Sequence, residues 1–74
     1  MDRLLLLGAG KIGAAIAELL CSSGDYKVTI ADREQELLDA INRDDVKRLV
    51  VDVEDGAAVL AAMKDQDAVV SALP

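Results

Sequence analysis

Short apolar segments alternate with amphipathic ones along the chain. Residues 3–7, 27–31, 46–51 and 67–71 are runs rich in aliphatic side chains. Such runs, without strict alternation of apolar and polar positions, are typical of strands buried on both faces of a parallel sheet. Residues 11–23 and the segments that follow Asp32 and Asp55 space their apolar side chains as helices do. The pattern therefore predicts four strands and three helices.

Each predicted helix has an expected inward face. These positions are Ile12, Ala15, Ile16, Leu19, Leu20, Leu37, Leu38, Ile41, Leu60 and Met63. The ends of the helices also carry signals. Gly24 suits the left-handed residue after the first helix, and Asp32 with Gln35 three positions later forms a capping box for the second. Asp52 or Asp55 is expected to cap the third helix.

The order of elements, β-α-β-α-β-α-β with short connections, predicts an α/β fold with a parallel sheet and helices on both faces. Right-handed crossovers restrict the topology. The expected strand order is 3-2-1-4, the first half of a doubly wound sheet and one strand of its second half.

Composition narrows the possible functions. The chain has 74 residues and a net charge of −6, which allows one small domain and disfavours nucleic acid and anionic membranes as partners. Cys21 is the only cysteine and histidine is absent, which excludes a disulfide framework, a His/Cys zinc site and a Ser-His-Asp triad within this chain. The apolar runs are too short to span a bilayer, and the first strand begins too early to leave room for a signal peptide. We expect a cytoplasmic protein that binds no metal.

The first strand is followed by a glycine-rich loop that suits a dinucleotide. Gly8 permits a tight turn, Gly10 lets the backbone approach a pyrophosphate, and Gly13 lets the helix pack closely on the strand. Free N–H groups at the start of the next helix then point at the anion.

Ala9, Lys11 and Ile12 fill the variable positions of this loop. The amides of Gly10, Lys11 and Ile12 are the expected phosphate donors. The Lys11 side chain has two interpretations, a charge contact to phosphate or simple exposure to solvent. A cation in the first helical turn opposes the helix dipole, and a bound pyrophosphate would remove that conflict.

Asp32 ends the second strand where a ribose would lie, and we expect it to accept hydrogen bonds from the 2′- and 3′-hydroxyls. A role as a helix cap is compatible with this one. A carboxylate here repels a 2′-phosphate and favours NAD over NADP. Arg33 leaves the choice open, because an adjacent guanidinium can pair with that phosphate or stack on adenine.

Two further turns are expected at the cofactor. Asp52 can accept from the adenine amino group while Val53 packs on the ring, although Asp52 can equally be a helix cap. Ser71, Ala72 and Leu73 follow the fourth strand, beside the point where the strand order reverses. Their backbone is expected near the nicotinamide.

These segments resemble the N-terminal NAD(P)-binding domain of the saccharopine dehydrogenase family. The resemblance covers essentially the whole chain, and its most telling parts are ADR at residues 31–33, VDV at 51–53 and DAVVSALP at 67–74. It implies a partial Rossmann fold over residues 1–74. It also implies that the following positions contact the cofactor: Gly8, Gly10, Gly13, Asp32, Arg33, Asp52, Val53, Ser71, Ala72 and Leu73.

The function that the resemblance implies is hydride transfer between a nicotinamide and an amine-bearing carbon. It carries over no catalytic residue, so we expect the catalytic domain to lie outside these residues and the chain alone to be inactive. The alternative is a regulatory NAD-sensing module of the potassium-transport type, which shares the glycine pattern and the acid after the second strand. An unpaired outer edge on the fourth strand is expected to favour self-association.

Overall fold

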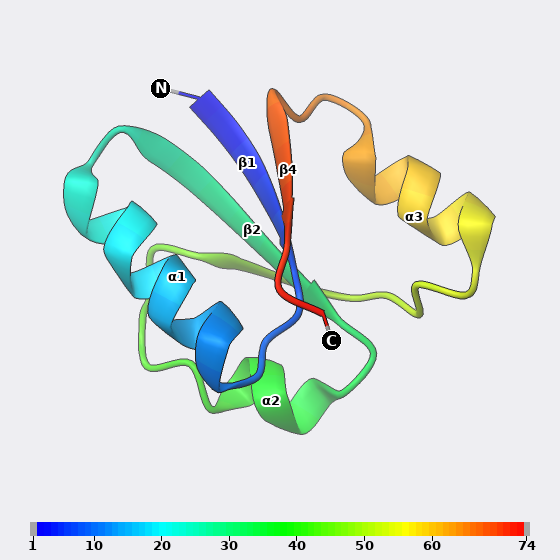
Figure 1. The fold of residues 1–74 in the computed structure, drawn as a ribbon, viewed down its shortest axis with the longest axis horizontal. Helices are drawn as coiled ribbons and strands as arrows, with labels where there is room; N and C mark the ends of the chain where they lie inside the picture. The colour runs from blue at the N-terminus through cyan, green and yellow to red at the C-terminus, as the bar shows by residue number, and fades with distance from the viewer. Residues whose placement is uncertain (1, 74) are drawn as a thin grey trace.

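The computed structural model describes residues 2–73 and has one four-stranded parallel sheet in that range. The elements are β1 (Asp2–Leu7), α1 (Lys11–Ser23), β2 (Tyr26–Asp32), α2 (Gln35–Asp39), β3 (Lys47–Val50), α3 (Gly56–Met63) and β4 (Ala68–Ser71). The strands lie in the order β3-β2-β1-β4, which confirms the predicted topology (Figure 1). The β3 and β4 strands are shorter than expected by one or two residues.

The sheet separates two apolar cores. Leu4 and Leu6 of β1 face α1 and α2, whereas Leu5 faces α3. Side chains alternate across a strand, so β1 contributes to both cores, and Leu5 and Leu6 are completely buried. Burial of β1 on both faces agrees with its run of four leucines. Figure 1 shows α1 and α2 on one side of the sheet and α3 on the other.

The predicted inward face of α1 is partly wrong. Ile12 and Leu19 are 69% and 73% exposed, and Gly13 and Ala17 are the buried positions. The helix is apolar on most of its surface, so spacing alone does not identify the packed face. Small residues point inward because they allow the close approach of α1 to the sheet. Its end is as expected, with Gly24 in the left-handed region at φ 76°.

The predicted face of α3 is wrong for the same reason. Leu60 is 70% exposed and Met63 is 39% exposed, whereas Ala62 is buried. The sequence of this helix is apolar almost throughout, and its small side chains again face the sheet. Asp55 is the cap, because its carboxylate accepts a hydrogen bond from the Ala58 N–H at 3.2 Å.

The capping box predicted for α2 does not form. The helix begins at Gln35, and its N-cap residue, Glu34, makes no side-chain cap hydrogen bond. Asp32 belongs to β2 and pairs with Val50 of β3, so its backbone is extended rather than poised to start a helix. The helix is short, but Leu38 is completely buried, and Ile41 is buried just beyond the helix end.

Candidate functional site

The β1–α1 loop is shaped by two glycines that no other residue can replace without strain. Gly8 has a φ of 109°, and a Cβ there would lie 3.2 Å from the backbone carbon of Ala72. A Cβ on Gly13 would overlap the carbonyl oxygen of Gly8. The first turn of α1 therefore rests directly on the loop that leaves β1, and the loop in turn rests on the segment after β4. These are the roles predicted for Gly8 and Gly13.

Gly10 differs from these two glycines, because the protein itself does not require it. Its φ is −68°, and a Cβ placed there would meet no atom within 4 Å. Gly10 is the N-cap of α1, and its carbonyl accepts the N–H of Ala14 at 2.8 Å. The amides of Lys11 and Ile12 in the first turn have no acceptor within the helix. The absent side chain leaves open space at the start of α1, and helix N-termini with free N–H groups are sites where phosphate can bind.

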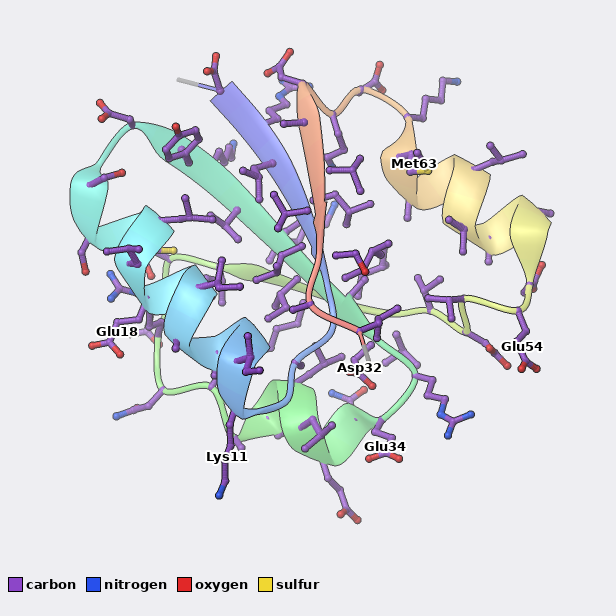
Figure 2. All side chains as sticks on the ribbon, in the orientation of Figure 1. Lys11, Glu18, Asp32, Glu34, Glu54 and Met63 are labelled. Carbon is purple, nitrogen blue, oxygen red and sulfur yellow. The ribbon has the colours of Figure 1, made fainter. Side chains whose placement is uncertain are left out.

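Asp32 joins the two loops at the carboxyl edge of the sheet. Its Oδ2 accepts the N–H of Ala9 at 2.9 Å, and its Oδ1 accepts the N–H of Glu34 at 2.9 Å. The carboxyl ends of β1 and β2 lie side by side because Leu7 pairs with Ala31 in the sheet. Figure 2 shows Asp32 here, with Glu34 beside it. Each carboxylate oxygen retains a second lone pair for a ligand hydroxyl.

The bond from Ala9 to Asp32 could not be found from spacing, because the two residues lie on different loops. Ala9 was expected to contact the cofactor, but its amide already donates to the Asp32 carboxylate. Lys11 is exposed, and its side chain extends away from Asp32 in Figure 2. The orientation agrees with the interpretation of Lys11 as a solvent-exposed side chain.

A cleft of about 460 Å³ opens beside Asp32. It brings together five of the residues singled out in the sequence, namely Asp32, Arg33, Asp52, Val53 and Leu73. Its other lining residues, which were not among the predicted cofactor contacts, are Ala31, Glu34, Leu37, Val51 and Glu54. The glycine loop adjoins this cleft through the contact of Ala9 with Asp32 and that of Gly8 with Ala72.

The turns after β3 and β4 are held locally. Asp52 Oδ1 accepts the N–H of Glu54 at 3.0 Å, so Asp52 stabilises its own turn and does not cap α3. The N–H of Ala72 donates to the carbonyl of Leu7 at 2.7 Å, which fixes the segment after β4 against the end of β1. Ser71 Oγ accepts the N–H of Leu73 at 3.4 Å.

Outside the cleft, Cys21 is half-buried on α1. Burial raises the pKa of its thiol above the ordinary value, and the negative charge of Asp45 adds to this effect. A protonated thiol is a poor nucleophile, in agreement with a structural role. Residues 2–73 contain no group of three or more His, Cys, Asp or Glu side chains that could hold a metal ion. No helix in the described part of the chain is long and apolar enough to cross a membrane.

The fold and this edge of the sheet define an α/β domain of the class in which a glycine loop and a helix N-terminus hold a dinucleotide. A family model described as "Saccharopine dehydrogenase NADP binding domain" matches residues 4–74, and the chain belongs to this family. Membership confirms the resemblance found in the sequence. It supports a nicotinamide dinucleotide as the cofactor class and gives no support to the potassium-transport alternative. The family description names NADP, so it does not support the expected preference for NAD.

Two comparisons add detail. The structure matches apo saccharopine dehydrogenase (L-Glu forming) from Saccharomyces cerevisiae with a TM-score of 0.87 and 29% identity. That match covers 100% of this chain and 17% of the yeast chain. Chloroplastic glutamyl-tRNA reductase 3 from Hordeum vulgare is 45% identical over 42 residues, which are 57% of this chain and 8% of that protein. The chain thus spans a small part of each relative.

Proposed function

We propose that this chain binds NADP across the carboxyl edge of its sheet, as the cofactor-binding part of an oxidoreductase. The observation that carries the proposal is the hydrogen bond of 2.9 Å between Asp32 Oδ2 and the Ala9 N–H. It holds a ribose-binding carboxylate against the loop whose glycine, Gly10, leaves room for a phosphate. The ribose-binding carboxylate and the phosphate-binding loop are therefore held in position relative to each other before the cofactor binds.

The pyrophosphate is assigned to the start of α1. The N–H groups of Gly10, Lys11 and Ile12 donate to its oxygens, and the positive end of the helix dipole favours its charge. The chain has an overall charge of −6, so this attraction must be local. Backbone amides supply it without a basic pocket.

The adenosine half is assigned to the cleft beside Asp32. The Asp32 carboxylate accepts from the ribose 3′-hydroxyl, which remains free beside the 2′-phosphate of NADP, through the lone pairs that Ala9 and Glu34 do not use. Arg33 lines the same cleft and is the only cation among its lining residues. We assign the 2′-phosphate to Arg33, whose guanidinium can bind two phosphate oxygens at once.

The proposal also assigns residues to the adenine and nicotinamide ends of the cofactor. Asp52 accepts from the adenine amino group, and Val53, which is 44% exposed in the cleft, packs on the ring. The backbone of Ser71, Ala72 and Leu73 borders the nicotinamide end. When bound, the nicotinamide accepts or donates a hydride, and we propose an amine-bearing carbon as its reaction partner, as in the family. This chain supplies no acid–base residue for that step, and we propose that it is inactive alone.

Substitution of Gly10 tests cofactor binding. Gly10→Val should abolish the increase in melting temperature that NADP produces, because the new side chain occupies the phosphate space. Gly56→Val is a matched control, since a Cβ at Gly56 also meets no atom within 4 Å but lies at the start of α3. A hundredfold excess of ligand over its Kd should stabilise the wild type and the control by about 2.7 kcal/mol. Equal responses of the two variants would contradict the assignment.

A further inference from the structure

The α3-side face of the sheet is apolar at one end and basic at the other. Toward the carboxyl edge, Leu5, Ala31 and Val51 are covered by α3. Toward the amino edge, Arg3 and Lys27 are the second residues of β1 and β2, and Lys47 is the first residue of β3. The paired positions Arg3–Lys27 and Thr29–Lys47 place these three cations on the same face as Leu5.

Lys64, in the turn after α3, completes a basic face formed by Arg3, Lys27, Lys47 and Lys64. These four residues line one cavity of about 340 Å³. They are half of the eight Lys and Arg residues in a chain whose net charge is −6. Their concentration at one edge of an otherwise acidic protein is not explained by the dinucleotide site, which lies at the other edge.

The four cations of the basic face outnumber the two acidic residues, Asp45 and Asp65, that line the same cavity. Among residues 2–73 the only ion pair is Arg43–Asp45, at 2.8 Å. Asp45 also lines the cavity, but Arg43 compensates its charge. Asp67 gives one carboxylate oxygen to the backbone N–H of Arg3 at 2.7 Å. Asp65 is the other acidic residue of the lining.

Like charges held side by side repel each other, and Arg3 lies directly opposite Lys27. A bound anion would relieve the repulsion, and the cavity has the size of a small-molecule site. A long polyanion such as nucleic acid would meet repulsion from the rest of the surface.

We propose that the basic face binds a small polyvalent oxyanion, a phosphate- or carboxylate-bearing metabolite with two or more negative charges. The site is separate from the dinucleotide cleft, since the two share no lining residue, and residues 4–7 of β1, roughly 15 Å of strand, separate Arg3 from the glycine loop. Both sites can therefore be occupied together. The proposal does not depend on which nicotinamide cofactor the chain binds.

Amide chemical-shift mapping by NMR tests the proposal with citrate and inorganic pyrophosphate as probes. Citrate should cause saturable shifts at residues 3, 27, 47 and 64. Pyrophosphate should cause these shifts and separate ones at residues 10–12. The stronger of the two probes at the basic face identifies carboxylate or phosphate as the preferred group.

The double variant Lys27→Gln, Lys47→Gln should weaken citrate binding at least tenfold. Lys11→Gln, Arg33→Gln removes the same charge at the opposite edge and should leave citrate binding unchanged. Loss of exposed, mutually repelling cations should not unfold the protein, and the dispersion of the amide spectrum checks this. Lys64→Gln provides an independent variant in the turn.

Three results would overturn the proposal. One is the lack of any saturable shift at the basic face, and another is equal weakening in both double variants. The third is binding of an acidic peptide, such as a decamer of glutamate, where neither small anion binds. That result would make the basic face a surface for a protein partner.

Discussion

The carboxylate of Asp32 accepts the backbone N–H of Ala9 at 2.9 Å, across the carboxyl ends of two neighbouring strands. The same carboxylate accepts the N–H of Glu34. Asp32 therefore positions the glycine loop as well as offering oxygens to a ribose. The two parts of the cofactor site are coupled through one side chain.

Replacement of Asp32 should reduce both stability and cofactor affinity. Asp32→Ala leaves two backbone donors without their partner, and each hydrogen bond to a charged group contributes about 1.5–3 kcal/mol. We expect a clear fall in the free energy of unfolding in urea and weaker binding of both NAD and NADP by calorimetry. Asp44→Ala, in the exposed α2–β3 loop, serves as the control. A stable Asp32→Ala variant that loses only affinity would show that the bond to Ala9 has no structural role.

Arg33 should distinguish the two nicotinamide cofactors. Arg33→Gln removes the cation assigned to the 2′-phosphate and should weaken NADP binding by up to about fivefold, because an exposed charge pair contributes at most about 1 kcal/mol. NAD affinity should stay unchanged. Lys11→Gln is the comparison, since any contact of Lys11 would be with the pyrophosphate shared by both cofactors. Equal losses for NAD and NADP in Arg33→Gln would refute the assignment.

Replacement by alanine should lower the stability of the protein at Gly13 and raise it at Gly56. A Cβ at Gly13 overlaps the Gly8 carbonyl, so Gly13→Ala must move backbone and should cost about 1–3 kcal/mol, as overpacking does. Gly56→Ala meets open space at the start of α3, and alanine's better helix propensity should raise stability by up to about 1 kcal/mol. Thermal or urea unfolding measures both. A neutral Gly13→Ala would indicate that α1 does not lie so close to the loop.

Arg48 should be important for the connection between α2 and β3. Its guanidinium donates to the carbonyl oxygens of Leu38 at 2.9 Å, Ile41 at 2.5 Å and Arg43 at 2.7 Å. Arg48→Met keeps an apolar stem but leaves part-buried acceptors without a donor, which should cost about 1–3 kcal/mol in urea unfolding.

Arg43→Met is the matched control for Arg48. It breaks an exposed ion pair with Asp45 and leaves the backbone acceptor of Arg43 in place. Exposed pairs contribute little, so this variant should unfold close to the wild type. A smaller loss of stability for Arg48→Met than for Arg43→Met would argue against a stabilising role of the Arg48 hydrogen bonds.

The residue pattern alone was enough to predict the elements, the strand order and several residues that line the cleft. Four apolar runs with helical segments between them allow few arrangements, right-handed crossovers restrict them further, and the doubly wound fold predicted the observed order 3-2-1-4. The conformations of Gly8 and Gly24 could also be anticipated, because both positions require a positive φ that glycine adopts easily. Asp32, Arg33, Asp52, Val53 and Leu73 were found from their places after strands, and these residues meet in one cleft.

The packed faces of α1 and α3 and the partner of the Asp32 carboxylate could not be predicted from the residue pattern. Both helices are apolar on most of their surface, so periodicity could not show that Ala17 and Ala62 rather than Leu19 and Leu60 face the sheet. That choice depends on how closely two backbones approach, which is a property of the packed pair. The partner of Asp32 depends on the register between β1 and β2, which places Ala9 beside it.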